Sequence, residues 1–466
     1  MKKIKTLIIA LFCMIISLPL IFFNFDENAV SEIDNRELTG NPLKVDYSTS
    51  ETGFWSTITS YVSDRIGFRN EAIRSYTVLN DKVFGVMEHP IYKYGKDGYV
   101  FCSGLSVNEH YGQYHEDFAD AILEIQTYCE ERDVPFVFVF EPAKPAMFQD
   151  KLPEGLNYNR EWVDEFLAAL DKRDINYVDN TKVLAEKIDE GEVVFNQKFD
   201  ANHWNKLGGF YGVNSILGNL KKEIDTVHIN ELFEMNISEK TEYSLPVSDF
   251  PIEENVPVIK PKFEPDYSMG DKYREEIELT DYYAFGYVNN ELRKKENAPK
   301  ALVFQGSYMN EYGYDFFANS FSEYIYVHDY QNIFNFDYYF NLFKPDCVVF
   351  EAAEYTFNET YFSHELMTDM KLNDSLVDVY DKCEELKREE ISRDDIKVEI
   401  GNQLTKLSCK LNKADQVWFV AGDEFDMRKR EDGYEVTVNT KDYEKSKENM
   451  KIYTLDGNVL TEHTIK

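Results

Sequence analysis

Continuous apolar runs separated by helical or loop segments dominate the middle of the chain. The clearest run, at residues 134–140, reads VPFVFVF, and similar runs occur at residues 301–304 and 347–350. Parallel sheets bury both faces of their strands, so this alternation predicts a mostly parallel α/β sheet flanked by helices. In such sheets functional residues follow the carboxyl ends of the strands. Those ends are expected at residues 141–144, 179–180, 305–307 and 351–355.

The first 25 residues have a different pattern. Residues 6–25 form one apolar stretch, which as a helix would cover about 30 Å, the thickness of a bilayer's hydrocarbon core. Lys2, Lys3 and Lys5 precede the stretch and acidic residues follow it. This charge bias places the N-terminus in the cytoplasm and the remaining chain outside. The absence of a small-residue cleavage motif favours an uncleaved anchor over a cleaved signal peptide, and both interpretations give an exported protein.

These patterns divide the chain into four parts. We expect a membrane anchor at residues 1–25, a helical lead-in at 26–90, the α/β domain at 91–386 and a small all-β accessory module, similar to a β-sandwich, at 387–466. A charge-rich segment, residues 231–299, is expected to be an insertion in the α/β domain; it contains Pro246, Pro251, Pro257, Pro261 and Pro265. Residues 91–103 predict a hairpin around Lys96-Asp97-Gly98. Residues 385–390 are interpreted as a solvated helix face.

Composition narrows the functional classes. The 50 Lys and Arg against 85 Asp and Glu give a net charge of −35, which argues against nucleic-acid binding and, unless the cleft is locally basic, against a strongly anionic substrate. The six cysteines include no CxxC pair, so neither a zinc site nor a disulfide framework is predicted. We predict no metal and no cofactor.

His203 is the first candidate for chemistry, because Asp200 stands three positions before it in the sequence FDANHW. A D-x-x-H turn lets the carboxylate receive the imidazole Nδ1–H and leaves Nε2 free as a base. The structural alternative is that Asp200 or Asn202 caps the helix that follows and that His203 packs against Trp204.

Ser307 is the second candidate. It follows the apolar run ALVF, and Gly306 permits a tight turn that would hold the hydroxyl at the carboxyl edge of the sheet. A serine there can be activated by a histidine, with backbone N–H groups of the turn as an oxyanion hole. The alternative is an ordinary Gly-Ser loop. The order Asp, His, Ser differs from that of α/β-hydrolases, but such triads are defined by geometry rather than order.

With these residues in place, the sequence resembles the SGNH-hydrolase-like domain of alginate O-acetyltransferase-type proteins, the DHHW family, whose members acetylate exported polysaccharides. The matching blocks keep the family's order over roughly residues 30–360, although two residues rather than one separate Asp200 from His203, and Gln305-Gly306 stand where Gly-Asp is frequent. The blocks are residues 31–38, 61–69, 96–101, 142–144, 151–153, 200–204, 305–308 and 344–355.

The resemblance implies that Ser307 attacks an acetyl donor, that His203 removes its proton and that Asp200 orients the imidazole. The backbone N–H of Ser307, helped by Asn310, would stabilise the oxyanion. Four residues at neighbouring strand ends could line the glycan cleft or serve packing: Lys144, Glu351, Glu354 and Tyr355.

The expected function is therefore a single-pass, membrane-anchored O-acetyltransferase acting outside the cytoplasm on a cell-surface or exported polysaccharide. A polytopic membrane acyltransferase is the expected source of acetyl groups. Two alternatives stay open: a secreted carbohydrate acetylesterase, and a noncatalytic glycan-binding or assembly scaffold with the same fold.

Overall fold

A six-stranded sheet with the order β6-β5-β12-β10-β11-β9 forms the centre of the computed structural model, which describes residues 2–26, 29–31, 33, 36–45, 47, 53–104, 110–246, 250–278 and 284–465. The pairs β6-β5, β5-β12, β12-β10 and β10-β11 are parallel, and β9 is antiparallel to β11 at one edge. The predicted mostly parallel α/β sheet is confirmed. The strands are β5 (Phe136–Glu141), β6 (Tyr177–Asp179), β9 (Ala284–Asn289), β10 (Lys300–Phe304), β11 (Glu323–His328) and β12 (Cys347–Ala353).

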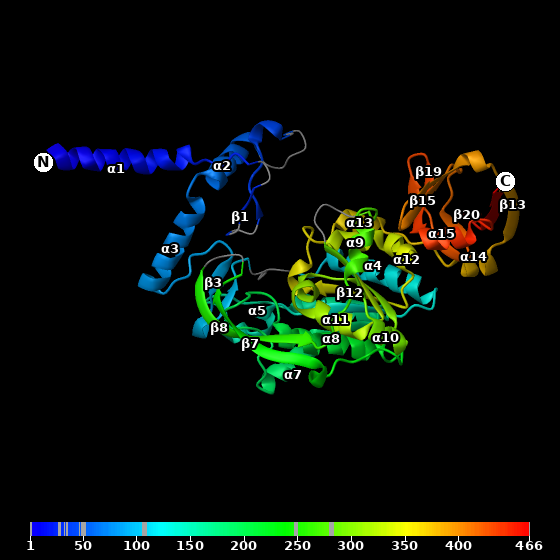
Figure 1. Ribbon diagram of the computed structural model, residues 1–466, viewed down its shortest axis with the longest axis horizontal. Helices are drawn as coiled ribbons and strands as arrows, with labels where there is room; N and C mark the ends of the chain where they lie inside the picture. The colour runs from blue at the N-terminus through cyan, green and yellow to red at the C-terminus, as the bar shows by residue number, and fades with distance from the viewer. Residues whose placement is uncertain are drawn as a thin grey trace.

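Helices cover both faces of this sheet, which explains the continuous apolar runs (Figure 1). In β5, Phe136, Phe138 and Phe140 belong to one core, while the alternate residues Val137 and Val139 belong to the other. The first core includes side chains of α4 (Gln113–Glu130), α6 (Glu161–Lys172), α12 (Phe336–Phe343) and α13 (His364–Asp369). The second includes side chains of α7 (Asn180–Asp189), α8 (Lys206–Leu220) and α11 (Tyr314–Ser320).

The segment expected to be an insertion, residues 231–299, supplies part of this sheet. Its first half is an antiparallel hairpin of β7 (Met235–Ser244) and β8 (Pro251–Pro261). After α9 (Ser268–Tyr273) the chain forms β9, the edge strand, and then α10 (Glu291–Lys295). The segment is therefore integral to the α/β body.

The N-terminal region extends away from this body (Figure 1). Among the described residues, α1 (Lys2–Ile21) contains a stretch, Lys3–Ile21, that is long and apolar enough to cross a membrane; a signal sequence has the same properties. A short pair, β1 (Val30–Ser31) with β2 (Arg36–Glu37), precedes α2 (Phe54–Arg65) and α3 (Arg69–Phe84). The predicted hairpin around residues 96–98 is confirmed as β3 (Tyr92–Tyr94) paired with β4 (Val100–Cys102).

The C-terminal β-rich module is present and contains two sheets that share a core. One sheet has the order β13-β21-β20-β16-β17, and the other β14-β15-β19-β18. The predicted helix face at residues 385–390 is wrong. These residues form β13, which pairs in parallel with β21, so neighbouring strands rather than local helix propensity decide their conformation.

The strands of the module are β13 (Glu385–Ile391), β14 (Ile396–Ile400), β15 (Leu404–Cys409), β16 (Gln416–Ala421), β17 (Asp423–Asp426), β18 (Arg428–Arg430), β19 (Gly433–Asn439), β20 (Lys451–Asp456) and β21 (Val459–Ile465). Helix α14 (Leu376–Lys382) precedes them, and α15 (Thr440–Ser446) lies between β19 and β20.

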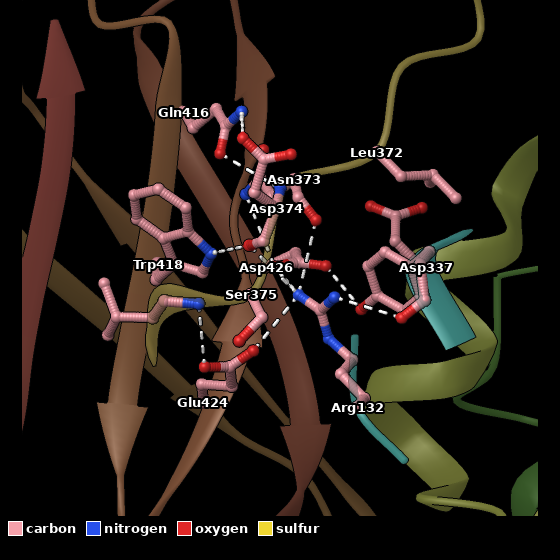
Figure 2. A network of polar contacts seen from close by, with 12 residues as sticks. Arg132, Asp337, Leu372, Asn373, Asp374, Ser375, Gln416, Trp418, Glu424 and Asp426 are labelled. Carbon is pink, nitrogen blue, oxygen red and sulfur yellow. Dashed lines mark hydrogen bonds and ion pairs between the residues drawn. The ribbon is translucent and has the colours of Figure 1, made fainter. Parts of the chain in front are cut away.

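Arg132, just after α4, fastens this module to the α/β body (Figure 2). Its guanidinium lies 3.1 Å from Glu424 and 3.5 Å from Asp426 of the module, and 3.6 Å from the ring centroid of Tyr128. Tyr128 donates its hydroxyl to Asp426 Oδ2 at 2.5 Å. Burial raises the pKa of Asp426 to about 7. Arg132 therefore pairs with two carboxylates of the module, and Arg428 of the module pairs with Asp337 of α12 across the same boundary.

We predict that Arg132→Ala lowers the free energy of unfolding by about 3 kcal/mol, because breaking a buried pair leaves a carboxylate without its counter-charge. Protonation of that carboxylate offsets only part of the loss. Calorimetry should show an earlier unfolding transition, and limited proteolysis should cut near residues 371–384. The matched control is Arg393→Ala at an exposed site of the module. Equal transition temperatures for the two variants would contradict this account of the junction.

Candidate active site

The turn after β10 carries Ser307. Strand β10 ends at Phe304, and Ser307 opens a helix that passes through a π-helical turn, Met309–Gly313, into α11. The N–H of Gly306 donates to the carboxylate of Glu351. A Cβ at Gly306 would meet that carboxylate at 3.1 Å and the Tyr330 ring at 3.2 Å. Glycine therefore allows the close turn that directs the chain into the helix.

The turn before α8 carries His203. Asp200 has a φ of +66°, a left-handed conformation that aspartate tolerates. Its Oδ1 accepts the N–H groups of Asn202 at 3.1 Å and His203 at 3.0 Å. The alternative of a helix cap at Asp200 or Asn202 is wrong, since Asn205 is the N-cap of α8. The carboxylate instead holds the turn in which the imidazole sits.

Two charged side chains, the buried Lys144 and the half-buried Glu254, hold this turn. The Lys144 ammonium donates to the carbonyl oxygens of Val100 at 2.9 Å, Gln197 at 3.1 Å and Asp200 at 3.0 Å. Burial lowers the pKa of Lys144 to about 8. Glu254, from β8, accepts the backbone N–H groups of residues 197–199 at 2.5 to 2.9 Å. Lys144 thus positions the Asp200 turn from inside the protein.

The two turns meet above the carboxyl edge of the sheet. His203 Nε2 lies 2.8 Å from Ser307 Oγ, and His203 Nδ1 lies 2.9 Å from both oxygens of Asp200. When the imidazole is neutral and protonated on Nδ1, Nε2 can accept the Ser307 O–H. The structure therefore brings Asp200, His203 and Ser307 into one hydrogen-bonded chain.

Three tyrosine hydroxyls surround this chain. Tyr355 Oη lies 2.5 Å from Ser307 Oγ and 3.3 Å from His203 Nε2. Tyr312 donates to Asp200 Oδ2 at 2.6 Å, and Tyr330 Oη accepts the Ser307 N–H at 3.4 Å. Sequence reasoning missed Tyr312 and Tyr330, because nothing in the local pattern separates them from the other tyrosines, 32 in total.

The pKa shifts of Asp200, His203 and Tyr355 agree with the roles of these residues in the hydrogen-bonded chain. Burial alone would raise the pKa of Asp200, but attraction to His203 and hydrogen bonds from His203 and Tyr312 hold it well below its usual range. Burial alone would lower the pKa of His203, and the Asp200 carboxylate outweighs burial and raises it. Burial holds the pKa of Tyr355 far above its ordinary value, so its phenol keeps its proton.

The other predicted site residues lie around this centre in different ways. Glu351 and Glu354 are buried; Glu351 accepts the Gly306 N–H, and Glu354 pairs with Arg160 at 2.9 Å. Both carboxylates, like Lys144, hold the framework of the turns instead of facing an opening. The side-chain amide of Asn310 donates to Glu311 at 3.4 Å. Tyr355 alone of the four predicted cleft residues contacts Ser307.

The described part of the chain contains no group of three or more His, Cys, Asp and Glu side chains that could hold a metal ion.

Three of the solved structures that resemble the chain do so at low identity. Bacillus cereus PatB1 with a sulfonyl adduct is 17% identical, with 60% of this chain and 97% of that chain covered and a TM-score of 0.43. The O-acetyltransferase domain of Pseudomonas putida AlgJ is 13% identical, with 62% and 95% covered and a TM-score of 0.40. A DHHW family protein from Eubacterium siraeum is 17% identical, with 61% and 100% covered and a TM-score of 0.38. No family model matches the chain, and no curated protein matches it significantly. At these identities and TM-scores the likenesses assign no activity to it.

We predict that Asp200→Asn lowers the pKa of His203, because the strongest of the carboxylates that oppose the effect of burial is then lost. Asparagine tolerates the left-handed φ at this position, so the turn should persist. An NMR titration of the His203 ring tests this. Tyr312→Phe is the control, since it keeps the carboxylate charge and should leave the pKa raised. An unchanged, raised pKa in Asp200→Asn would refute the electrostatic coupling.

Proposed function

We propose that the protein is a membrane-anchored, extracytoplasmic O-acetyltransferase that acts on a cell-surface or exported polysaccharide. The observation that carries the proposal is the chain Asp200, His203, Ser307, in which His203 Nε2 lies 2.8 Å from Ser307 Oγ. This is the arrangement of nucleophile, base and orienting carboxylate that acyl transfer through a serine ester requires. The order of sequence blocks that resembles the DHHW family favours acetyl as the group and a glycan as the acceptor.

In the first half-reaction Ser307 Oγ attacks the acetyl carbonyl of the donor and forms a new C–O bond. His203 Nε2 takes the serine proton, and the bond to the leaving group breaks as His203 returns that proton to it. In the second half-reaction a glycan hydroxyl attacks the acetyl-serine while His203 removes its proton. The ester bond to Ser307 then breaks, and Oγ recovers a proton from His203.

The tetrahedral intermediates need hydrogen-bond donors for their oxyanion. The Gly306 N–H is occupied by Glu351, so it does not serve. Two other donors lie beside Ser307 Oγ. The Ser307 N–H makes a long bond of 3.4 Å to Tyr330 Oη that an oxyanion could replace, and the raised pKa of Tyr355 keeps its hydroxyl protonated. We assign these two groups to the oxyanion, and Tyr355 takes the place given to Asn310 by the resemblance.

The negative charges near His203 favour an uncharged glycan as the acetyl acceptor. Three carboxylates, those of Asp200, Glu311 and Glu351, raise the pKa of His203 by their charge. The nearby cation, Lys144, is turned toward backbone carbonyls. A strongly anionic glycan would meet repulsion here. The membrane anchor would hold the site beside a polytopic membrane acyltransferase that supplies acetyl groups.

Ser307 is the nucleophile of the proposed reaction. The full chain, incubated with p-nitrophenyl acetate and a neutral oligosaccharide, should release p-nitrophenol and produce acetylated oligosaccharide, detected by mass spectrometry. Ser307→Ala should abolish both, because the nucleophile is gone. Ser60→Ala, at an exposed position of α2, should change neither. Serine-dependent hydrolysis without transfer would instead support an acetylesterase, and loss of all serine-dependent chemistry would support a noncatalytic scaffold.

Tyr355 supplies one of the two proposed oxyanion donors. Tyr355→Phe should lower kcat by about 100-fold or more with little change in KM, since removal of one oxyanion donor acts on the transition state. Tyr330→Phe should retain most of the wild-type kcat, because the Tyr330 oxygen accepts the Ser307 N–H in the resting enzyme. Steady-state kinetics of the two variants, which give kcat and KM separately, test this difference. Full kcat in Tyr355→Phe would remove this residue from the oxyanion hole.

A further inference from the structure

Helix α3 has its apolar side on the outside. Tyr76, Leu79 and Val83, spaced three and four positions apart, lie on one face of the helix and are 58%, 57% and 60% exposed. Phe84, at the end of the helix, is 69% exposed. Helices on the surface of a soluble protein normally turn their apolar stripe inward. A continuous exposed stripe of this kind marks a contact with something apolar.

The side of α3 opposite this stripe includes the half-buried Ile73 and two polar contacts. Thr77 is buried and donates its hydroxyl to the carbonyl of Glu88 at 2.5 Å. Asp81 accepts the hydroxyl of Tyr94, from the β3–β4 hairpin, at 3.0 Å. The first contact ties α3 to the loop that follows it, and the second ties its C-terminal part to the β3–β4 hairpin. The outward direction of its apolar stripe is therefore a property of the fold.

The elbow between α2 and α3 is joined to the end of α1. The N–H of Gly67 donates to the carbonyl of Pro19 at 2.9 Å, and the N–H of Asn24 donates to the carbonyl of Arg65 at 2.8 Å. The rings of Phe22 and Phe68 lie 5.1 Å apart. A Cβ at Gly67 would come within 2.6 Å of Phe22, so the elbow fits closely around the helix end.

This junction places the start of α3 at the C-terminal end of α1. In Figure 1, α3 starts near the C-terminal end of α1 and runs across its direction. If α1 spans a bilayer, its C-terminal end lies at the outer surface, and a helix that leaves from there across its direction runs along that surface.

We propose that α3 lies in the outer interfacial layer of the bilayer, with Tyr76, Leu79 and Val83 inserted at the boundary between headgroups and acyl chains. The inference rests on the proposed membrane anchor and is independent of the acetyl chemistry. Tyrosine suits this layer because its ring is apolar and its hydroxyl reaches water. The net charge of −35 disfavours attraction to anionic headgroups, so the contact is apolar. With α1 and α3 both engaged, the body is held at a fixed height and orientation above the membrane.

Fluorescence quenching of the full chain in phosphatidylcholine nanodiscs tests the proposal. The accessible cysteines, Cys13, Cys102 and Cys383, are replaced by alanine, and a bimane label is placed at Leu79→Cys. Cys129, Cys347 and Cys409 are kept, because they are buried and should not react with the label. Lipids with a nitroxide near the headgroup should quench this label strongly. The same label at Lys222→Cys, an exposed position on the body, should remain unquenched. A label at Ile15→Cys, quenched by lipids with a mid-chain nitroxide, reports the anchor separately.

Quenching at residues 15 and 79, but not at 222, supports the proposal. Quenching at 15 without quenching at 79 overturns it while the anchor stands. A label at 79 that is shielded from aqueous iodide but is not quenched by the lipids also overturns it, since a protein then covers the stripe. No quenching at residue 15 refutes the anchor and the interfacial helix together, and leaves the chemistry of Ser307 to its own assay.

Discussion

Parallel pairing of β12 with β5 on one side and β10 on the other is the constraint on which the candidate site depends. The register aligns Val349 with Val137 and with Val303, so the three strands end at one edge of the sheet. Ser307 follows β10, Tyr355 follows β12, and Lys144 follows β5. Each reaches the site because its strand stops at that edge. A shift of one residue in either pairing would turn the strand's side chains to the other core.

Groups that are costly to bury hold the turns at this edge. Lys144 is fully buried among carbonyl oxygens, and Glu351 is buried against the Gly306 N–H. An ionised group in such a place is stable only when its partners are arranged for it. These bonds restrict the Asp200 and Gly306 turns to a narrow range of positions. The geometry between His203 and Ser307 is thus prepared by framework residues before any substrate arrives.

Local pattern was sufficient to predict some of these features and insufficient for others. The apolar run at residues 134–140 predicted a buried parallel strand, and Asp200 with His203 suggested a carboxylate and imidazole in contact, because both signals lie within a few residues. Strand β9 was missed because its place at the sheet edge depends on pairing with β11, distant in sequence. The acidic and basic residues of β13 were predicted to form a helix, because their partner strand, β21, comes about 70 residues later and gives no local signal. Tyr312 and Tyr330 acquire their roles only through tertiary contacts.

In the proposed reaction, Ser307 Oγ is the one hydroxyl of the protein that takes the acetyl group from the donor. Peptide mapping by mass spectrometry, after brief exposure of the full chain to p-nitrophenyl acetate and acid quenching, tests this most directly. We expect one acetyl group on the peptide that contains Ser307, and its absence in His203→Ala, because the hydroxyl then lacks its base. Acetylation confined to other residues, or equal labelling of Ser307 in His203→Ala, would contradict it.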